Sequence, residues 1–542
     1  MRQTVVSSER GEQVILGVDV GTGSARAALF DLSGKMLAAA KQDITLWRGP
    51  GALAEQSSAD IWAAVCCTVR AALAEAKVDP ERVAGIGFDA TCSLVVLGEG
   101  GSSLPVGPSE DPSRNIIVWM DHRAIEQAER INATGHDVLK YVGGRISPEM
   151  ETPKLLWLKE ERPEVFNRAW QFFDLADFLT WKSTGDLSRS TCTVTCKWTY
   201  LAHDRRWDPT YFRQIGLGEL ADENFVRIGT KIVDPGTPVG QGLTVAAAAD
   251  LGLVPGTPVA AGMIDAHAGG IGTVGIEGNP ATHMGYVFGT SSCTMTSTIN
   301  PVFVPGVWGP YFSAMVPGMW LNEGGQSAAG AAIDHLVTCH PASQQAWEVA
   351  QERGISIVQL LTEKLTENVT SFSGLVQRVE GLHVVPEFLG NRAPNADPHA
   401  RAVISGLGIE RDLESLASLY LAGIYGIGYG LRQIIDSQSD AGAPVEKVVI
   451  SGGAGQSELI RQLLADAIGK PVLASDAEEP VLLGAALLGA VAGGAFPDVH
   501  AAMAKTSRVG KVYAPAGDEV KALHERRYDA FLRLQRLAKE IR

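Results

Sequence analysis

The sequence predicts an α/β protein with two large lobes around a central cleft, and three observations support this prediction. The chain has 542 residues, which is more than one hydrophobic core usually supports. Apolar strand-like runs alternate with amphipathic helical segments along its length. A Gly-rich strand–turn–strand pattern near the start returns near the middle, which indicates a diverged duplication. We therefore expect two domains, 1–275 and 276–542.

Strands and helices alternate in the first half. The segment GVDVGTGSARAALFD, from Gly17 to Asp31, has an apolar run on each side of a Gly-rich turn and predicts a hairpin. Val83–Thr91 predicts another apolar strand, and β-branched residues in Thr191–Leu201 favour strands there. Helical patterns occur at Ala59–Lys77, Glu151–Glu160 and Phe166–Lys182.

The second half repeats this alternation. HMGYVFGTSSCTMTST, from His283 to Thr298, predicts a second hairpin. A buried strand is expected at Val445–Ile450, followed by a glycine turn and by a helix after Ser457. The apolar, Ala-rich segment Glu478–Gly494 predicts a helix that packs in the core.

The first Gly-rich turn is a candidate phosphate site. Gly21 and Gly23 can adopt positive φ and turn backbone N–H groups toward an anion, while Thr22 and Ser24 add hydroxyl donors. Asp19 would face the phosphates, which makes sense only with a divalent cation, usually Mg²⁺, between the negative charges. The alternative is an ordinary Gly-rich hairpin with a surface Asp.

Two later turns extend this interpretation. Gly289–Ser292 aligns with the first turn, but Val287 takes the place of Asp19, so only the first turn carries a carboxylate for a metal. At the third turn, Gly452 and Gly453 would let the chain pass close under a base or ribose, where a side chain would collide. A plain β–α turn is the alternative there.

Asp265 is the candidate general base. It follows the predicted strand PVAAGMI, and carboxyl ends of strands in α/β sheets face the ligand crevice. The alternative is that Asp265 caps a helix beginning at Ala266. The chain has no GxxxxGK[ST] motif. It has one GxGxxG, Gly270 to Gly275, which we reject as a dinucleotide turn because IEGNP follows at once and leaves no room for the required helix.

Composition limits the partners. The net charge is −15 without any basic run, which argues against a nucleic-acid partner. No apolar run approaches the length of a membrane span, and MRQTVVSSERGEQ lacks the apolar core of a signal peptide. Seven cysteines without a CxxC pair suggest a reducing cytosol, so we expect a cytoplasmic protein without membrane association. The histidines are scattered, which gives little support for a zinc site.

The chain resembles the FGGY carbohydrate kinases over nearly its whole length. The matching pieces are GVDVGTGSARAALFD, GIGFDATCS, WMDHRA, PKLLWLKE, GMIDAHAGG, GTSS, EGGQSAAG, PEFLGNRAP and SGGAGQSELIRQLLAD, in family order. The resemblance implies two ATPase domains of the actin and hexokinase (ribonuclease H-like) type. It further implies Mg²⁺ held through water by Asp19 and Asp265 as the base. It implies ATP contacts from Gly21, Thr22, Gly23, Ser24, Gly289, Thr290, Ser291, Gly330, Gly452, Gly453, Ala454 and Ser457.

Within this family the chain looks most similar to the ribulokinases. That resemblance implies sugar contacts from Lys197 and Glu323, whose charged groups suit neighbouring hydroxyls. Further substrate contacts are expected from Ala90, Thr91, Cys92, Trp119, Asp121 and Asp265. The alternatives are a salt bridge for Lys197, a helix cap for Glu323, a core position for Trp119, and an internal pair of Asp121 with Arg123.

These residues together predict ATP-dependent phosphorylation of the terminal hydroxyl of a ketopentose, D-ribulose, to D-ribulose 5-phosphate. L-ribulose, D-xylulose and a pentitol such as ribitol are alternative substrates in the same family. A sugar sensor or an actin-like ATPase is the alternative from another class. A homodimer is a further expectation, based on relatives.

Overall fold

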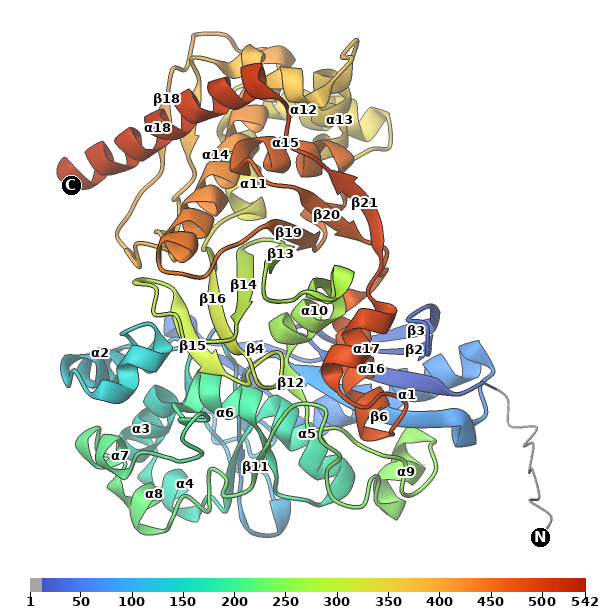
Figure 1. Cartoon of the computed structure of the whole chain (residues 1–542). Coiled ribbons are helices and arrows are strands. Elements are labelled where there is room, and N and C mark those ends of the chain that lie inside the picture. Colours follow the sequence, from blue (N-terminus) through green and yellow to red (C-terminus); the bar gives the residue numbers. More distant parts are fainter. Residues whose placement is uncertain (1–11) are drawn as a thin grey trace.

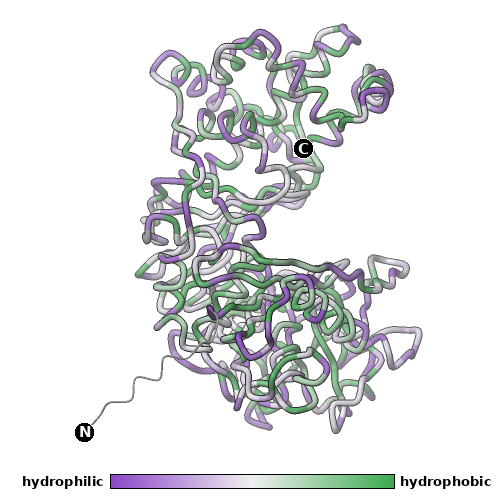
Figure 2. Tube along the Cα trace, turned by 90° about the vertical axis from the view of Figure 1, so that its right-hand side faces the viewer, coloured by the Kyte–Doolittle hydropathy of each residue, from purple (hydrophilic) through white to green (hydrophobic). Residues whose placement is uncertain are grey.

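The computed structural model describes residues 12–542. Figure 1 shows two lobes stacked one above the other, and the side view in Figure 2 shows them joined along one side. Most of the segment in which we sought a signal peptide, residues 1–11, lies outside the described residues. Between residues 12 and 542, no helix combines the length and the apolar character needed to cross a membrane.

The first lobe is built on a five-stranded sheet in the order β12-β6-β1-β2-β3. β1 pairs antiparallel with β2, as the hairpin pattern predicted, and it also pairs parallel with β6. The register places the Cα atoms of Asp19 and Asp89 opposite each other, and those of Met263 and Asp89. The strands are β1 (Val14–Val20), β2 (Ser24–Asp31), β3 (Met36–Asp43), β6 (Val83–Ala90) and β12 (Met263–Ile264).

A seven-stranded sheet in the second lobe repeats this arrangement. β13 pairs antiparallel with β14 and parallel with β19, as β1 does with β2 and β6. The sheet order is β15-β16-β14-β13-β19-β20-β21. The strands are β13 (His283–Phe288), β14 (Ser292–Thr298), β15 (Trp308–Phe312), β16 (Trp320–Gln326), β19 (Lys447–Ser451), β20 (Val472–Ser475) and β21 (Val509–Tyr513).

A third sheet, in the order β4-β5-β8-β7-β9, extends the first lobe. Its strands are β4 (Trp47–Arg48), β5 (Ala54–Gln56), β7 (Leu94–Leu97), β8 (Ile116–Ile117) and β9 (Gln171–Asp174). The shorter pairs are β10 (Arg189–Ser190) with β11 (Ile232–Val233), and β17 (His383–Val385) with β18 (Val403–Ser405).

Helices surround these sheets. Those of the first lobe are α1 (Ser58–Ala76), α2 (Ile125–Ala133), α3 (Glu151–Glu161), α4 (Pro163–Arg168), α5 (Leu175–Thr184), α6 (Thr191–Trp198), α7 (Pro209–Gln214), α8 (Gly218–Asp222), α9 (Val245–Leu251) and α10 (Asp265–Val274). The others are α11 (Gly330–Cys339), α12 (Ser343–Glu352), α13 (Ile357–Thr366), α14 (Leu413–Asp440), α15 (Glu458–Ile468), α16 (Pro480–Ala492), α17 (Val499–Thr506) and α18 (Asp518–Glu540).

Two local predictions were wrong, and one rejection was confirmed. Thr191–Leu201 contains α6 instead of strands, because Ser190 caps the helix and every residue of α6 is buried, so packing outweighs β-propensity. Phe166–Lys182 is not one helix, since β9 separates α4 from α5. The rejection of GxGxxG at Gly270–Gly275 as a dinucleotide turn is confirmed, because only the 3₁₀ helix Ile276–Gly278 follows it before β13, and the motif itself overlaps α10.

α16 comes from the C-terminal part of the sequence but packs in the first lobe, whereas α18 and the C-terminus lie in the second lobe. α16 packs against β1, β6 and α10 (Figure 1). These contacts depend on glycine, because a Cβ atom at Gly87 would lie 1.9 Å from the Ala485 carbonyl oxygen, and one at Gly484 would lie 1.9 Å from that of Ala268. Leu482, Leu487 and neighbouring side chains belong to the same apolar core as the first lobe. The two lobes therefore do not correspond to one division of the chain between residues 275 and 276.

Candidate active site

Three carboxylates from different segments meet at the edge of the first sheet. Asp19 lies near the end of β1, Asp89 near the end of β6, and Asp265 directly after β12. Because these strands are parallel neighbours in register, their carboxyl ends bring the side chains together. Asp19 is 2 % exposed and Asp89 is fully buried. The alternative of a surface Asp in the first hairpin is thus excluded.

The charges in this cluster are only partly balanced. Arg26 donates from Nε to Asp19 Oδ2 (2.7 Å) and from Nη1 to Glu479 Oε2 (2.8 Å). Neither carboxylate oxygen of Asp89 has a hydrogen-bond partner among the described residues. Burial and the charge of Asp19 raise the pKa of Asp89 well above its ordinary value, and they raise that of Asp265 to about 6. A bound cation would relieve this repulsion.

Asp265 is the first residue of α10, and its Oδ1 accepts a hydrogen bond from the Ala266 N–H (2.7 Å). The N-cap position belongs to Ile264, so Asp265 does not occupy the position of an ordinary helix cap. Its carboxylate retains an oxygen that can face a substrate hydroxyl, since the backbone bond uses only Oδ1.

The first Gly-rich turn has a different backbone from the one expected. Gly21 and Gly23 do not adopt positive φ, because the turn closes through the Gly21 N–H and the Ser24 carbonyl (3.0 Å). Thr22 has its carbonyl bound by the Gln56 side chain (2.8 Å). Gly23 is exposed, and a Cβ atom there would meet nothing within 4 Å. Backbone space for a ligand is therefore present, although the left-handed conformation is not.

The second turn contacts the start of α11. The Gly330 N–H donates to the Gly289 carbonyl (2.9 Å), and a Cβ atom at Gly330 would lie only 2.8 Å from that oxygen. The Ala329 N–H donates to the Thr290 carbonyl (3.0 Å). Thr290 and Ser291 are exposed, so their hydroxyl groups are free to meet a ligand.

The third turn combines structural and open positions. Gly452 has φ near +89°, and a Cβ atom there would lie 2.6 Å from the Phe288 carbonyl oxygen. Ser457 caps α15 through the Ile460 N–H (3.4 Å). These two residues meet the requirements of a plain β–α turn. Gly453 is exposed with open space around it, and Ala454 begins the short 3₁₀ helix Ala454–Gln456.

Lys197 and Glu323 approach each other from the two lobes. Lys197 lies on α6, is 6 % exposed, and places its ammonium group 5.3 Å from the ring centre of Trp308. No carboxylate in the part of the chain that the structure describes lies within ion-pair distance of it. Although burial opposes the charge, Cys92 and Glu323 raise the pKa of Lys197 well above its ordinary value. Glu323 lies within β16, so it is not a helix cap.

Glu323 is held by groups that sequence reasoning missed. Its Oε1 accepts from Arg392 Nη2 (2.7 Å), and its Oε2 lies 3.3 Å from His267 Nε2. Although burial opposes it, the hydrogen bond from His267 and the charges of Lys197 and Arg392 lower the pKa of Glu323 well below its usual range. Arg392 was visible in PEFLGNRAP and His267 in GMIDAHAGG, but no local pattern linked either to Glu323.

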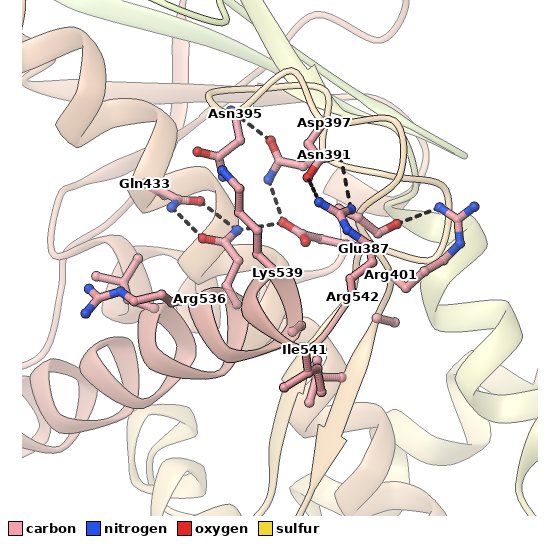
Figure 3. Close-up of a pocket in the computed structure, with 16 residues that line it drawn as sticks. Glu387, Asn391, Asn395, Asp397, Arg401, Gln433, Arg536, Lys539, Ile541 and Arg542 are labelled. Atoms are coloured by element: carbon pink, nitrogen blue, oxygen red, sulfur yellow. Dashed lines mark hydrogen bonds and ion pairs between the residues drawn. The ribbon is translucent and has the colours of Figure 1, made fainter.

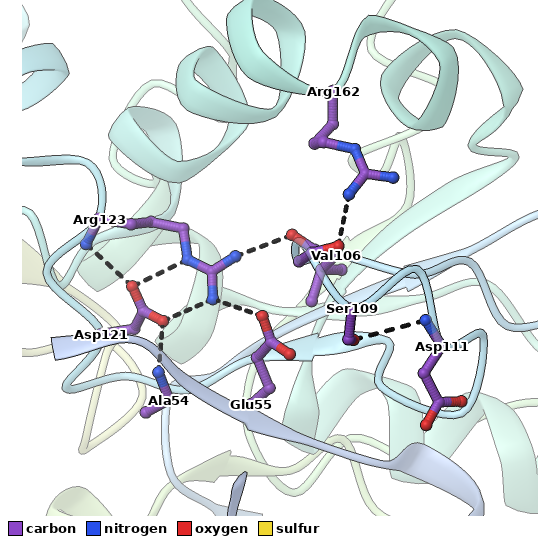
Figure 4. Close-up of polar contacts among 9 residues, drawn as sticks. Ala54, Glu55, Val106, Ser109, Asp111, Asp121, Arg123 and Arg162 are labelled. Atoms are coloured by element: carbon purple, nitrogen blue, oxygen red, sulfur yellow. Dashed lines mark hydrogen bonds and ion pairs between the residues drawn. The ribbon is translucent and has the colours of Figure 1, made fainter. Parts of the chain in front are cut away.

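The other predicted substrate residues differ in how available they are. Asp121 is fully buried. Both of its oxygens accept hydrogen bonds from the Arg123 side chain, and Oδ2 also accepts one from the Ala54 N–H (Figure 4), which favours the internal pair. Trp119 is partly buried and donates from its indole N–H to Thr22 Oγ1 (2.9 Å), which links it to the first turn. Ala90, Thr91 and Cys92 are buried at the end of β6.

Two further features lie outside the predicted site. Cys192, Cys196 and His267 place one ligand atom each within 4.8 Å of one another, a cluster that the scattered sequence positions concealed. A cavity of about 470 Å³ lies between α14, α18 and the 387–403 segment (Figure 3). Its polar groups largely satisfy one another, as Arg542 does with Asp397 (2.6 Å), and no predicted site residue lines it.

Models of the N-terminal and C-terminal domains of the FGGY family of carbohydrate kinases match residues 14–272 and 284–493. The chain belongs to this family. This FGGY kinase is 47 % identical over 543 residues to a human FGGY carbohydrate kinase domain-containing protein, covering 98 % of each chain. It is 38 % identical over 510 residues to a D-ribulokinase of Saccharomyces cerevisiae, covering 88 % of this chain and 71 % of that protein.

The fold of this FGGY kinase is also that of solved sugar kinases. The structure of xylulose kinase from Rhodospirillum rubrum matches with a TM-score of 0.81 at 21 % identity, covering 98 % of this chain and 99 % of that one. Plasmodium falciparum glycerol kinase with ADP matches with a TM-score of 0.74 at 18 % identity, over 97 % and 99 %. These matches confirm the two-domain α/β fold expected from the sequence.

Proposed function

We propose that this FGGY kinase transfers the γ-phosphoryl group of ATP to the terminal hydroxyl of D-ribulose, giving D-ribulose 5-phosphate. The observation that carries the proposal is the position of Asp265. It stands in the carboxylate cluster with Asp19, and the charge of Lys197 also acts on it. Lys197 and Glu323 offer one cation and one anion to a polyol. Asp265 would thus connect the groups proposed to bind phosphate with those proposed to bind the sugar.

The carboxylate cluster fits Mg²⁺. Asp89 offers two buried oxygens that have no hydrogen-bond partner within residues 12–542, and Asp19 lies opposite it on β1. Carboxylate oxygens are the ligands that Mg²⁺ prefers, and water completes its shell. We infer that Asp19 and Asp89 hold the ion. When bound, Mg²⁺ neutralises phosphate charge during transfer.

Asp265 would orient the attacking hydroxyl and accept its proton. Its pKa of about 6 leaves the carboxylate mostly ionised at neutral pH, yet closer to the operating pH than that of an ordinary Asp. In phosphoryl transfer the proton leaves late, so the position of the hydroxyl matters more than strong basicity. The charged groups of Lys197 and Glu323 would fix the sugar by binding adjacent hydroxyls.

The nucleotide would lie between the turns. We propose that the backbone and hydroxyl groups of the first two turns bind the phosphates and that the open space at Gly453 receives the adenosine. The full proposed set is Gly21, Thr22, Gly23, Ser24, Gly289, Thr290, Ser291, Gly330, Gly452, Gly453, Ala454 and Ser457. Closure of the lobes would exclude water, since an open site would hydrolyse ATP.

The choice of D-ribulose is supported by the similarity to the yeast D-ribulokinase and by the paired charges at Lys197 and Glu323. The proposed substrate contacts also include Ala90, Thr91, Cys92 and Trp119. A cytoplasmic location and a homodimer stay predictions.

ADP release with a panel of sugars tests the proposal. The panel contains D-ribulose, L-ribulose, D-xylulose, ribitol and glycerol, each with ATP and Mg²⁺, and Asp265→Asn serves as the inactive control. We expect D-ribulose to give the highest kcat/KM and the control to remain at background. A stronger response to another sugar would replace the substrate, whereas ADP release without any sugar would favour an ATPase.

A further inference from the structure

A buried chain of polar groups extends from Glu323 away from the sugar space. His267 Nε2 lies 3.3 Å from Glu323 Oε2, and His267 Nδ1 lies 3.1 Å from Cys192 Sγ. Cys192 and His267 are completely buried. They come from α6 and α10, whereas Glu323 comes from the second lobe. Phosphoryl transfer itself gives neither Cys192 nor His267 a role.

The geometry and the pKa values together define where the protons lie. His267 Nε2 faces a carboxylate and therefore carries a proton, whereas Cys192 Sγ, which also accepts from the Ile264 N–H (3.4 Å), shares one proton with His267 Nδ1. The pKa values place this shared proton on Nδ1. Although burial opposes it, the hydrogen bond from Cys196 and the charge of His267 lower the pKa of Cys192 to about 5. Despite the same burial, Cys192 and Glu323 raise the pKa of His267 to about 10.

Glu323 has one hydrogen-bond acceptor position left for a ligand. A carboxylate can accept about four hydrogen bonds. Arg392 and the Cys293 thiol (3.6 Å) use Oε1, and His267 uses one position on Oε2. A second position on Oε2 remains for an incoming hydroxyl group. Because all three neighbours act as donors toward the carboxylate, Glu323 stays ionised and can only accept.

We propose that Cys192 and His267 form a positioning pair for Glu323, in which the thiolate keeps the imidazole doubly protonated and the imidazolium holds Glu323 as an oriented acceptor for one sugar hydroxyl. This inference rests on the proposed function. In this proposal the fixed carboxylate of Glu323 distinguishes sugars by the position of one hydroxyl group. A site built to accept a hydrogen bond from a hydroxyl rejects analogues that lack that hydroxyl.

The surrounding charges are compatible with this state. Around His267, Cys192, Glu323 and Asp265 are the anions, and His267, Lys197 and Arg392 are the cations. Glu149 also acts on Lys197 and Arg392, and it is hydrogen-bonded to His122. The other titratable groups near this chain are Cys196, Cys293 and Tyr311. A soft metal ion bound by Cys192, Cys196 and His267 is a rival explanation, but the direct 3.1 Å contact between sulfur and Nδ1 needs no ion.

The pH dependence of KM for the sugar tests the pair. In the intact enzyme this KM should stay constant between pH 6 and 9. In Cys192→Ala the imidazole loses its thiolate and becomes neutral within that range, so its hydrogen bond to Glu323 weakens from an ionic to a neutral donor. KM for the sugar should therefore rise with pH, by up to about tenfold, while KM for ATP stays constant. Cys192→Asp restores an anion and should restore the flat profile. Cys66→Ala, which removes a half-buried thiol on α1, is the control.

Histidine NMR makes the test independent of the substrate. The His267 ring should remain protonated at pH 8 in the intact enzyme and lose its proton in Cys192→Ala, whichever sugar the enzyme uses. A neutral His267 at pH 8 in the intact enzyme would overturn the inference. A pH-independent KM in Cys192→Ala, or stoichiometric zinc in the purified protein that a chelator removes together with activity, would do the same. A panel without any active sugar would refute the proposed function alone.

Discussion

Replacing Asp265 with Asn probes both the proposed base and the electrostatics of the carboxylate cluster. The two side chains have the same shape, and the Asn carbonyl oxygen can keep the hydrogen bond that Asp265 Oδ1 accepts from the Ala266 N–H (2.7 Å). The substitution therefore removes a negative charge and a proton acceptor with little change in packing.

Activity should fall while sugar binding survives. A positioned general base contributes about 10²–10⁴-fold to the rate. We expect kcat of Asp265→Asn to decrease by a factor of this order. KM for the sugar should change little, because Lys197 and Glu323 keep their positions. In the intact enzyme, kcat/KM should rise with pH up to about 6 and then level off, since the pKa of Asp265 lies at about 6.

The folding stability of Asp265→Asn should rise, in contrast to its activity. Folding raises the pKa of Asp265 from an ordinary 3.8 to about 6, so the ionised group destabilises the folded state once pH exceeds 3.8, with the full effect above 6. That difference corresponds to about 3 kcal/mol at most, and partial contact of the side chain with solvent reduces it to about 1–3 kcal/mol. Asn carries no charge and avoids this cost.

The assay pairs kinetics with urea unfolding in EDTA. At pH 7.5 Asp265→Asn should be nearly inactive and more stable than the intact enzyme, whereas at pH 4 the difference in stability should shrink to about 0.5 kcal/mol or less. Turnover near the normal rate would refute the assignment of the base. A variant that is less stable at pH 7.5 would refute the reasoning about crowded charges.

Three further predictions follow from named contacts. Lys197→Met should raise KM for the sugar about 10–100-fold without changing KM for ATP, because a hydrogen bond from a charged donor is lost; equal changes in steady-state kinetics would exclude a sugar contact. Gly484→Ala should lower the free energy of unfolding in urea by about 1–3 kcal/mol or more, since its Cβ would meet the Ala268 carbonyl at 1.9 Å, whereas Gly374→Ala, with open space, should not. Asp89→Asn should reduce the stabilisation that added Mg²⁺ gives in thermal unfolding, and an unchanged shift would remove Asp89 from the metal site.

Patterns within single segments were sufficient for part of the site. Asp19 and Asp265 could be identified because each follows an apolar run that ends at a sheet edge. Asp89 obeys the same rule at the end of Val83–Ala90, yet we interpreted only the residues after it, Ala90 to Cys92, as substrate contacts and passed over the carboxylate. The signal was present, and the register with Asp19 made it decisive.

Other residues could not be placed from the sequence. His267, Glu323 and Arg392 are separated by 56 and 69 positions, and their contacts depend on how the two lobes meet. The helical state of Thr191–Trp198 could not be predicted either. Its β-branched residues favour a strand locally, but burial of every residue of the segment decided the conformation.

The sequence by itself determined the alternation of strands and helices, the duplicated hairpins, the family, and the carboxylates at the strand ends, because these are written in local periodicity and motif order. Only the tertiary structure decided that α16 returns to the first lobe, that Asp89 stands unpaired between Asp19 and Asp265, and that Cys192 and His267 support Glu323. The physical reason is that charge and packing act between atoms a few ångströms apart, whereas these residues lie tens to hundreds of positions apart in the chain.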